Sequence, residues 1–232
     1  MRKKIPKNRY CKGKSDGLPL QYLFYICTTM QRLKDDIQRQ IAEGAESLFL
    51  EKGFRKASMR DIAVKSGVSL SNIYNYYTGK DALFSELVAP AVTAIERMLD
   101  EHHGRQSMDI REMYSADYFR LVVNEYRDLL SRNRRGLELL FFHAQGSSFE
   151  NFKEKYADRA TQVFKEYLVR MKARHPELNI HISDFVIRLH TVWMFALFEE
   201  ILRQKIKPDE IEQIVTEYIT GEIYGWSELM NL

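Results

Sequence analysis

Cysteine and proline are scarce in this chain, and no uninterrupted apolar run is long enough to cross a membrane. Its two cysteines both lie within the first thirty residues, which excludes a disulfide framework and a cysteine-based zinc site in the rest of the protein. The most apolar stretch, residues 183–205, contains Arg188, Glu199 and Glu200, so it falls short of the ~20 apolar residues that a membrane span needs. Five prolines and eleven glycines in 232 residues, with apolar residues recurring every three to four positions, predict an all-α fold.

Signatures of catalysis are missing as well. The chain has no glycine-rich phosphate loop, no metal-ligand spacing, and no serine or cysteine nucleophile in an elbow motif. We therefore expect a protein that is not an enzyme and that has no metal and no cofactor. His102 and His103 could suggest a metal site, but adjacent side chains on a helix face different directions. A solvated helix end is the interpretation we favour for this pair.

Positive charge is unevenly distributed along the chain. The formal net charge is +3, but residues 1–29 hold seven lysines and arginines against one aspartate, which leaves a net charge of −3 for the remainder. We treat residues 1–29 as a separate extension, for which three interpretations stay open: a signal-peptide mimic without a convincing cleavage site, a mobile basic arm that contacts phosphate or the minor groove, or translation from a start upstream of Met30. Outside this extension, affinity for a polyanion must come from a local patch.

Two short helices joined by a tight turn are predicted for residues 58–80, SMRDIAVKSGVSLSNIYNYYTGK. Ser58 can cap the first helix, and Asp61 three residues later completes a variant of the capping box. Gly67 can adopt the positive φ that ends this helix without steric cost, and Ser69 can cap the next helix. The pattern is that of a helix-turn-helix.

The outward face of the second helix distinguishes a packing motif from a DNA-reading helix. Ile73 and Tyr77, four residues apart, are expected to point inward, and no charged residue occurs between Ser69 and Thr78. Asparagine amides can bond base edges in the major groove, and serine, asparagine and tyrosine also bond phosphates. A helical hairpin with no role in DNA binding is the alternative. The residues expected to contact DNA are Ser58, Arg60, Ser69, Leu70, Ser71, Asn72, Tyr74, Asn75, Tyr76 and Lys80.

Basic residues flank this outward face. Residues 52–80 carry six lysines and arginines against the single acid Asp61, a net charge of +5, which is the electrostatic footprint expected for a polyanion. Lys80 opens the following helix, and we expect its ammonium group and the free N–H groups of that helix to hold a DNA phosphate. The local excess of positive charge therefore favours double-stranded DNA as the partner.

Residues 36–87 resemble the DNA-binding domain of the TetR family of bacterial transcriptional regulators. The resemblance rests on the helix AEGAESLFLEKGF and on SMRDIAVKSGVSLSNIYNYYTGKDALF, with a serine opening the second helix, Asp-Ile-Ala within it, Gly-Val-Ser at the turn, a tyrosine in the third helix and Lys-Asp-x-Leu opening the fourth. The chain departs from the family at residues 70–71, where a small or basic residue and then Gly or Pro are commoner. It departs again at residues 77–79, where Phe-x-Ser or Phe-x-Asn is commoner.

The resemblance implies a cytoplasmic transcriptional regulator, with a homodimeric repressor as the expected form. Such a protein binds a palindromic DNA operator and is released by a small-molecule effector in its second domain. The division implied is a DNA-binding domain at residues 30–80 and a helical regulatory and dimerisation domain at residues 81–232. A non-specific DNA-binding protein, or a partner-binding protein, that uses the same fold without a ligand is the alternative.

Helical periodicity continues through the rest of the chain. The expected helices cover residues 34–52, 80–103, 114–131, 136–145, 149–174, 183–205 and 208–229. The last two are apolar on more than one face, so each must be covered on more than one side. We expect this pair to meet its symmetry copy in a four-helix bundle, with packing into the monomer core as the alternative. The residues expected at this contact are Phe185, Leu189, Trp193, Ile214, Tyr218, Gly221 and Gly225.

A ligand cavity is expected among the helices of the second domain, lined by aromatic and sulfur-containing side chains with few polar groups. A histidine in an apolar helix needs a hydrogen-bond partner, and a ligand could supply it. Packing in an ordinary core is the alternative for each candidate. The candidates are Tyr118, Tyr126, Phe142, His143, Phe164, Tyr167, His190 and Met194.

Overall fold

A computed structural model describes residues 20–232, and side chains are described from residue 31 onward. The interpretations offered for residues 1–19 lie outside this part of the chain. Residues 20–232 are folded as helices and connecting turns without a strand, which confirms the predicted all-α class. The α-helices are α1 (Leu20–Lys56), α2 (Met59–Ser66), α3 (Leu70–Ile73), α4 (Lys80–His103), α5 (Ala116–Arg132), α6 (Arg134–Phe142), α7 (Phe152–Arg174), α8 (Asp184–Arg203) and α9 (Pro208–Met230).

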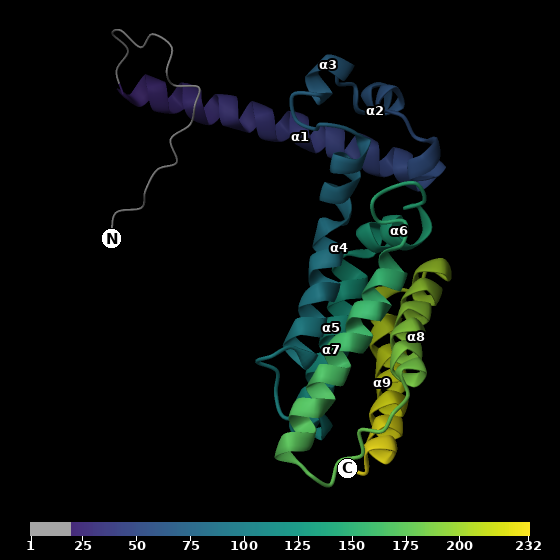
Figure 1. Ribbon diagram of the computed structural model, residues 1–232. Helices are drawn as coiled ribbons and strands as arrows, with labels where there is room; N and C mark the ends of the chain where they lie inside the picture. Colours follow the sequence, from purple (N-terminus) through teal and green to yellow (C-terminus); the bar gives the residue numbers. More distant parts are fainter. Residues whose placement is uncertain (1–19) are drawn as a thin grey trace.

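The first three helices form a separate layer, which we term the head (residues 31–79). Figure 1 shows α1 lying across the top of the molecule, with α2 and α3 above it and the remaining helices below. One face of α1 is apolar and packs inward, because Ile41, Ala45 and Phe49 are fully buried. The predicted start at residue 34 is wrong, since α1 already begins at Leu20.

Capping residues set the ends of α2 as the sequence predicts. The Ser58 hydroxyl accepts the N–H of Asp61 at 3.1 Å, and the Asp61 carboxylate accepts the backbone N–H of Ser58 at 3.1 Å. This reciprocal pair completes the capping box and satisfies two donors that a helix start leaves free. Gly67 ends the helix with a φ of 69°, in the left-handed region that glycine adopts without strain.

Helix α4 joins the head to the remaining helices, which we term the body (residues 80–232). Its bounds agree with the predicted 80–103. Phe84, near its start, is fully buried and packs edge-on against Phe49 at 5.3 Å and Phe54 at 5.2 Å between ring centroids. Phe149, in the turn before α7, lies 6.3 Å from the Phe84 ring. Head and body therefore share one continuous apolar core around the first turns of α4.

The body is a bundle whose long helices run away from the head (Figure 1). Helix α5 packs on α9, α7 packs on α8, and α4 packs on α6. Two clusters of buried side chains fill the bundle: a large one continuous with the head, and a smaller one at the far end that includes Ile110, Tyr167 and Met230. The predicted order of helices is confirmed, although α7 begins at Phe152 and not at residue 149.

Candidate functional site

The second helix of the helix-turn-helix is short and held by its cap. Ser69 accepts the backbone N–H of Asn72, and α3 ends at Ile73, after which turns continue to Tyr76. Ile73 is fully buried and Tyr77 nearly so, which confirms that both point into the head. The Tyr77 hydroxyl donates to Glu86 of α4 at 2.8 Å, and this contact ties the end of the motif to the body.

The predicted reading face is accessible. Ser71, Tyr74 and Asn75 are exposed, with Tyr74 at 52% of its surface, and Leu70 and Asn72 are half-buried. The side-chain amide of Asn75 donates to the side-chain oxygen of Asn72 at 3.3 Å, so the two amides form one polar unit on the surface. Tyr76 differs from the prediction, because its ring packs against the core of the head and is half-buried.

The head also carries exposed cations at the end of α1 and on α2. Lys52, Arg55, Lys56 and Arg60 are exposed, and none forms an ion pair with another residue of the described chain. Lys65 is paired with Glu51 at 3.2 Å. Unpaired surface cations on the same domain as an uncharged helix face are suited to phosphate contacts.

Lys80 lies differently from the expectation that it holds a phosphate. Its ammonium group donates to the backbone carbonyls of Phe54 at 2.7 Å and Ala57 at 2.8 Å and lies 4.2 Å from the centre of the Phe54 ring. Burial of the ammonium lowers the pKa of Lys80. These contacts bind the end of α1 to the start of α4. Gly53, with a φ of 74°, interrupts α1 just before Phe54. The sequence could not show this, because the role depends on where α1 ends in space.

An apolar surface remains uncovered on the last two helices. Phe185, Trp193 and Tyr224 are exposed over 73%, 53% and 68% of their surface. Gly221 and Gly225 face open space, with no atom within 4 Å of where a Cβ would stand. The other three residues predicted for this contact, Leu189, Ile214 and Tyr218, are half-buried, and the latter two pack against the monomer core.

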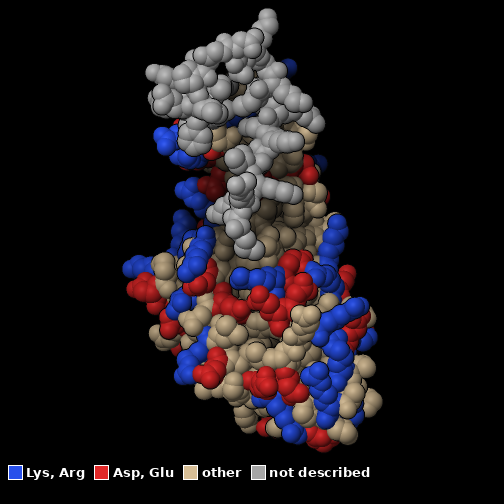
Figure 2. Space-filling model, turned by 90° about the vertical axis from the view of Figure 1, so that its left-hand side faces the viewer, with Lys and Arg blue, Asp and Glu red and all other residues tan. Residues whose placement is uncertain are grey.

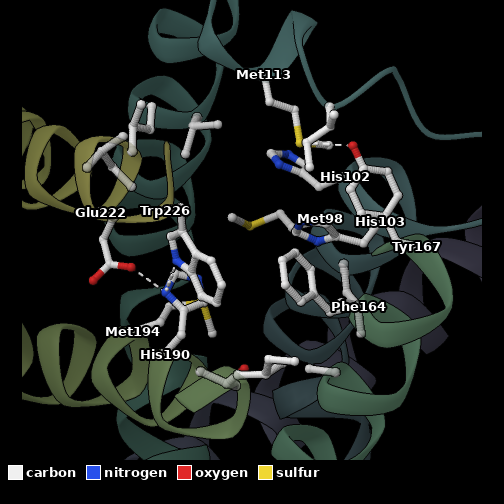
Figure 3. A pocket seen from close by; sticks show the side chains of 18 of the residues that line it. Met98, His102, His103, Met113, Phe164, Tyr167, His190, Met194, Glu222 and Trp226 are labelled. Atoms are coloured by element: carbon white, nitrogen blue, oxygen red, sulfur yellow. Dashed lines mark hydrogen bonds and ion pairs between the residues drawn. The ribbon is translucent and has the colours of Figure 1, made fainter. Parts of the chain in front are cut away.

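A cavity of about 170 Å³ lies within the body among α4, α5, α7, α8 and α9. Its lining draws on both core clusters, so the cavity is the place where the core of the bundle is interrupted. Figure 3 shows side chains from several helices pointing into it. The predicted ligand-binding residues that line it are Tyr118, Tyr126, Phe164, Tyr167, His190 and Met194.

Phe142 and His143 do not line this cavity. The Phe142 ring lies at the surface beneath the guanidinium of Arg203, at 5.3 Å. The His143 carbonyl accepts the N–H of Phe54 at 2.9 Å, which places the residue at the joint between α6 and the head. Phe142 is the last residue of α6 and His143 its C-cap, and no residue of α6 lines the cavity.

His102 and His103 are interior residues, so the prediction of a solvated helix end is wrong. The His102 ring nitrogens lie 2.6 Å from the Tyr118 hydroxyl and 2.6 Å from the Glu125 carboxylate. The His103 ring lies edge-on to Phe164 and Tyr167, at 4.9 and 5.3 Å between centroids. Burial lowers the pKa of His103 to about 3, so its ring is neutral at physiological pH.

A second histidine–carboxylate pair lies on the opposite wall of the cavity. Nδ1 of His190 contacts the Glu222 carboxylate and lies 3.2 Å from the indole nitrogen of Trp226. Glu222 and Trp226 were not predicted as site residues. Their spacing gives a signal that could have identified them, because both follow Tyr218 at intervals of four residues and so share its face of α9.

No cluster of three or more metal-binding side chains occurs in residues 31–232. Among residues 20–232, no helix is long and apolar enough to span a membrane. On the face of the body seen in Figure 2, acidic and basic side chains are intermixed. The unpaired basic side chains of the head therefore differ from the charge distribution of that face.

Comparison with known proteins agrees with this geometry. A family profile described as bacterial regulatory proteins, tetR family, matches residues 41–87. An uncharacterized HTH-type transcriptional regulator, YfiR of Bacillus subtilis (strain 168), is 31% identical over 75 residues, which cover 32% of this chain and 37% of the relative. The match thus spans little more than a third of that protein's length.

Solved structures share the fold over most of the chain. NalD, the secondary repressor of the MexAB-OprM multidrug efflux pump in Pseudomonas aeruginosa, has a TM-score of 0.55 at 21% identity, covering 86% of this chain and 98% of that one. A TetR-family regulator from Streptomyces coelicolor A3 has a TM-score of 0.53 at 21% identity, covering 76% of this chain and 87% of that one. Residues 41–87 therefore match the tetR family of bacterial regulatory proteins, and the chain shares its all-helical fold with solved structures of TetR-family regulators.

Proposed function

We propose that this regulator is a homodimeric repressor that binds a palindromic operator and is released when a small molecule enters the cavity of the body. The observation that carries the proposal is the uncharged, exposed face of α3, on a head that also carries unpaired cations at the end of α1 and on α2 and that shares its core with a cavity-bearing body. A helix that binds a DNA groove needs an exposed face without acidic side chains. A ligand-controlled regulator needs a packed connection between its DNA-binding and ligand-binding parts.

Base reading is assigned to the exposed polar groups of the turn after α3. Asn75 has an exposed amide that is coupled to Asn72, and amides can bond adenine edges in the major groove. Ser71 and Tyr74 are exposed beside it and suit contacts to bases or phosphates. Arg60 and the cations at the end of α1 suit phosphate contacts, which contribute affinity without sequence preference.

A dimer is proposed for two reasons. One short helix makes too few contacts for a specific affinity, and two-fold proteins place two such helices about 34–36 Å apart, one turn of B-DNA, or more. The exposed apolar surface around Trp193 and Tyr224 suits burial against its own copy. Gly221 and Gly225 would allow the helices to approach closely.

Release follows from linkage between the two sites. A ligand can bind better to a conformation in which the separation of the two heads does not match the operator. Operator affinity then falls by the same factor by which operator binding weakens the ligand, and the coupling free energy is typically ~1–3 kcal/mol. Helix α4 is the proposed lever, because it starts in the shared core at Phe84 and ends at the cavity with His102 and His103. The contact between Phe54 and the His143 carbonyl adds a second connection through α6.

The experiment is selection of bound genomic fragments, followed by binding measurements at a stated salt concentration. Asn75→Ala is expected to change which sequence is preferred, whereas Arg60→Ala weakens all sequences alike and lowers the salt dependence by about one counterion. Lys155→Ala, at an exposed position on α7, is the control and leaves binding unchanged. Equal affinity for operator and random DNA would favour the alternative of a non-specific DNA-binding protein.

The dimer is tested independently of DNA. Trp193→Glu places a charge on the exposed apolar surface and is expected to give monomers in sedimentation experiments. Val169→Glu, on α7 at 63% exposure, is the matched control and keeps the dimer. A wild-type protein that is monomeric at micromolar concentration contradicts this part of the proposal.

A further inference from the structure

We propose that the ligand of the cavity is a neutral aromatic molecule of about one or two rings that carries an acceptor oxygen, and that carboxylates and phosphates are rejected. The inference rests on the proposed function in one respect only, namely that the cavity binds an effector. It is carried by the size of the cavity, by the nature of its walls, by its charges and by one hydrogen-bond donor that shares its partner atom with a carboxylate.

The size of the cavity sets the size of the ligand. Its volume of about 170 Å³ slightly exceeds that of an engineered apolar cavity of ~150 Å³ that binds benzene. A molecule of one ring with a substituent, or of two fused rings, fits such a space without unfolding the bundle. A long acyl chain needs more room than the structure provides.

Aromatic rings in contact with one another form one wall of the cavity. Trp226 lies edge-on to Phe164, with centroids 5.1 Å apart and planes inclined by 64°, and Tyr167 continues this wall behind Phe164. Met98 and Met194 also line the cavity (Figure 3). Aromatic faces and thioethers favour a flat, polarisable ligand over a branched aliphatic one.

The charges around the cavity disfavour an anion. Among the described residues that line it there is no lysine or arginine. The nearest guanidinium, Arg170, is turned away and donates to the carbonyls of His103 and Gly104. His103 is neutral, and the carboxylate of Glu222 lies on the cavity wall. A bound carboxylate or phosphate would therefore lose its hydration without gaining a cationic partner.

A cationic ligand is disfavoured as well. Glu222 is already paired with His190, and Glu125 is paired with His102 with side chains only 14% and 10% exposed. A ligand cation could use Glu222 only by breaking an existing pair, which leaves the partner histidine without its acceptor. A neutral ligand leaves both pairs intact.

One donor on the wall shares its partner atom with a carboxylate. The indole N–H of Trp226 lies 3.2 Å from Nδ1 of His190, which also contacts the Glu222 carboxylate. A ring nitrogen carries either one proton or one lone pair, so Nδ1 cannot donate to Glu222 and accept from Trp226 at the same time. The indole N–H can only donate. When Nδ1 donates to Glu222, the indole N–H is available for an acceptor oxygen of the ligand.

The opposite wall can complete the recognition. The His103 ring and the Tyr126 hydroxyl have no hydrogen bond to any other residue in the described part of the chain, and both line the cavity. Figure 3 shows His103 across the cavity from Trp226. A ligand between these walls can accept from the indole while its ring packs on Phe164. A buried polar group without a hydrogen-bond partner costs free energy, so a ligand that bonds to such groups binds more tightly.

The test uses four probes of matched size with the full-length protein: acetophenone, ethylbenzene, benzoate and benzylammonium. Equilibrium dialysis at pH 7.5 is expected to give binding of acetophenone about 3- to 10-fold tighter than that of ethylbenzene, as one added hydrogen bond implies. Benzoate and benzylammonium are expected to bind at least about tenfold more weakly than acetophenone. Tightest binding by either charged probe, or binding of none of the four at millimolar concentration, overturns the proposal.

Trp226→Phe keeps an aromatic ring and removes the N–H group. It is expected to bring the affinities for acetophenone and ethylbenzene close together while ethylbenzene still binds. Trp193→Phe, outside the cavity and 53% exposed, is the matched control and keeps the wild-type preference. A preference for acetophenone that survives in Trp226→Phe contradicts the assigned donor.

Operator binding measured on the same protein without any probe separates the two proposals. Specific DNA binding together with failure of the probes leaves the proposed function in place and removes the inference about the ligand. Binding of the probes as expected, without specific DNA binding, removes the proposed function and keeps the inference about the ligand.

Discussion

The head and the cavity region differ in how they treat polar groups in the interior. In the head, both ends of α2 and the start of α3 are capped, and the ammonium group of Lys80, which reaches the end of the head from the start of α4, has two carbonyl partners. In the cavity region, the Trp226 indole and the His103 ring lack full partners, and two histidine–carboxylate pairs lie within the bundle. A core in which every polar group has a hydrogen-bond partner fixes one geometry. A core with a cavity leaves polar groups to which a ligand can supply the missing hydrogen bonds.

The two ends of α4 therefore differ: its start is tightly packed, and its end borders the cavity. Near its start, Phe84 is packed among aromatic rings from α1 and from the turn before α7. Near its end, Met98, His102 and His103 border empty space. Movement of α4 at the cavity end reaches the head through the packed end, so the packed end should resist substitution and the cavity end should tolerate it.

The largest effect is expected from Phe84→Ala. The side chain is fully buried in the shared core, and loss of a buried phenylalanine typically costs ~3–5 kcal/mol because a cavity remains. Urea unfolding followed by circular dichroism measures the loss. Phe142→Ala, at 36% exposure, is the control and should cost less than about 1 kcal/mol. Equal losses for the two variants would mean that α4 is not the packed joint.

Lys80→Met is expected to be next in size. It leaves the carbonyls of Phe54 and Ala57 without their donor, at a cost of about 2 kcal/mol in the free energy of unfolding. Lys65→Met, which removes only an exposed ion pair with Glu51, is the matched control and should change stability by less than about 1 kcal/mol. A Lys80 variant of wild-type stability that loses affinity for all DNA would restore the phosphate contact that the sequence predicts.

His103 gives the stability of the body a dependence on pH. Its pKa in the folded protein is lowered to about 3, so below about pH 6.5 the unfolded chain binds a proton that the folded protein does not. The free energy of unfolding therefore falls as the pH drops, by up to about 1.4 kcal/mol per pH unit from this group. His103→Leu should flatten the curve between pH 6.5 and 5 in urea titrations. An unchanged slope would place the ring in contact with solvent.

Ser58→Ala is expected to have the smallest effect of the four. Loss of the capping box at α2 costs about 1 kcal/mol, within the usual range for a cap. Tyr126→Phe, which removes a cavity hydroxyl without a partner among the described residues, should cost less still. Thermal unfolding of the two variants side by side measures the difference. A larger loss for Tyr126→Phe would show that its hydroxyl is satisfied inside the cavity.

Local patterns predicted most of the fold. The caps at Ser58, Ser69 and Ser183 and the proline that opens α9 each begin a helix where the sequence places one, because capping depends on residues a few positions apart. The start of α1 was missed because the change in composition near residue 30 was taken as a boundary. No glycine or proline lies between Leu20 and Gly44, so the backbone has no reason to leave the helix there.

Contacts between helices could not be predicted in the same way. Six of the eight expected cavity residues line the cavity, since aromatic residues on inward faces identify the interior. The pairs of His102 with Glu125 and of His190 with Glu222 join different helices, and their existence depends on how the bundle is assembled. The inward turn of Lys80 was missed for the same reason.

The two tryptophans of this chain lie in two different environments, one against the cavity and one on the uncovered surface of α8. Intrinsic fluorescence can therefore follow the two events separately. With Trp193 replaced by phenylalanine, the remaining emission reports entry of a molecule beside Trp226. With Trp226 replaced, a blue shift on concentrating the protein reports that Trp193 has left water, so one spectrometer can establish the order in which the subunits meet and the interior is filled.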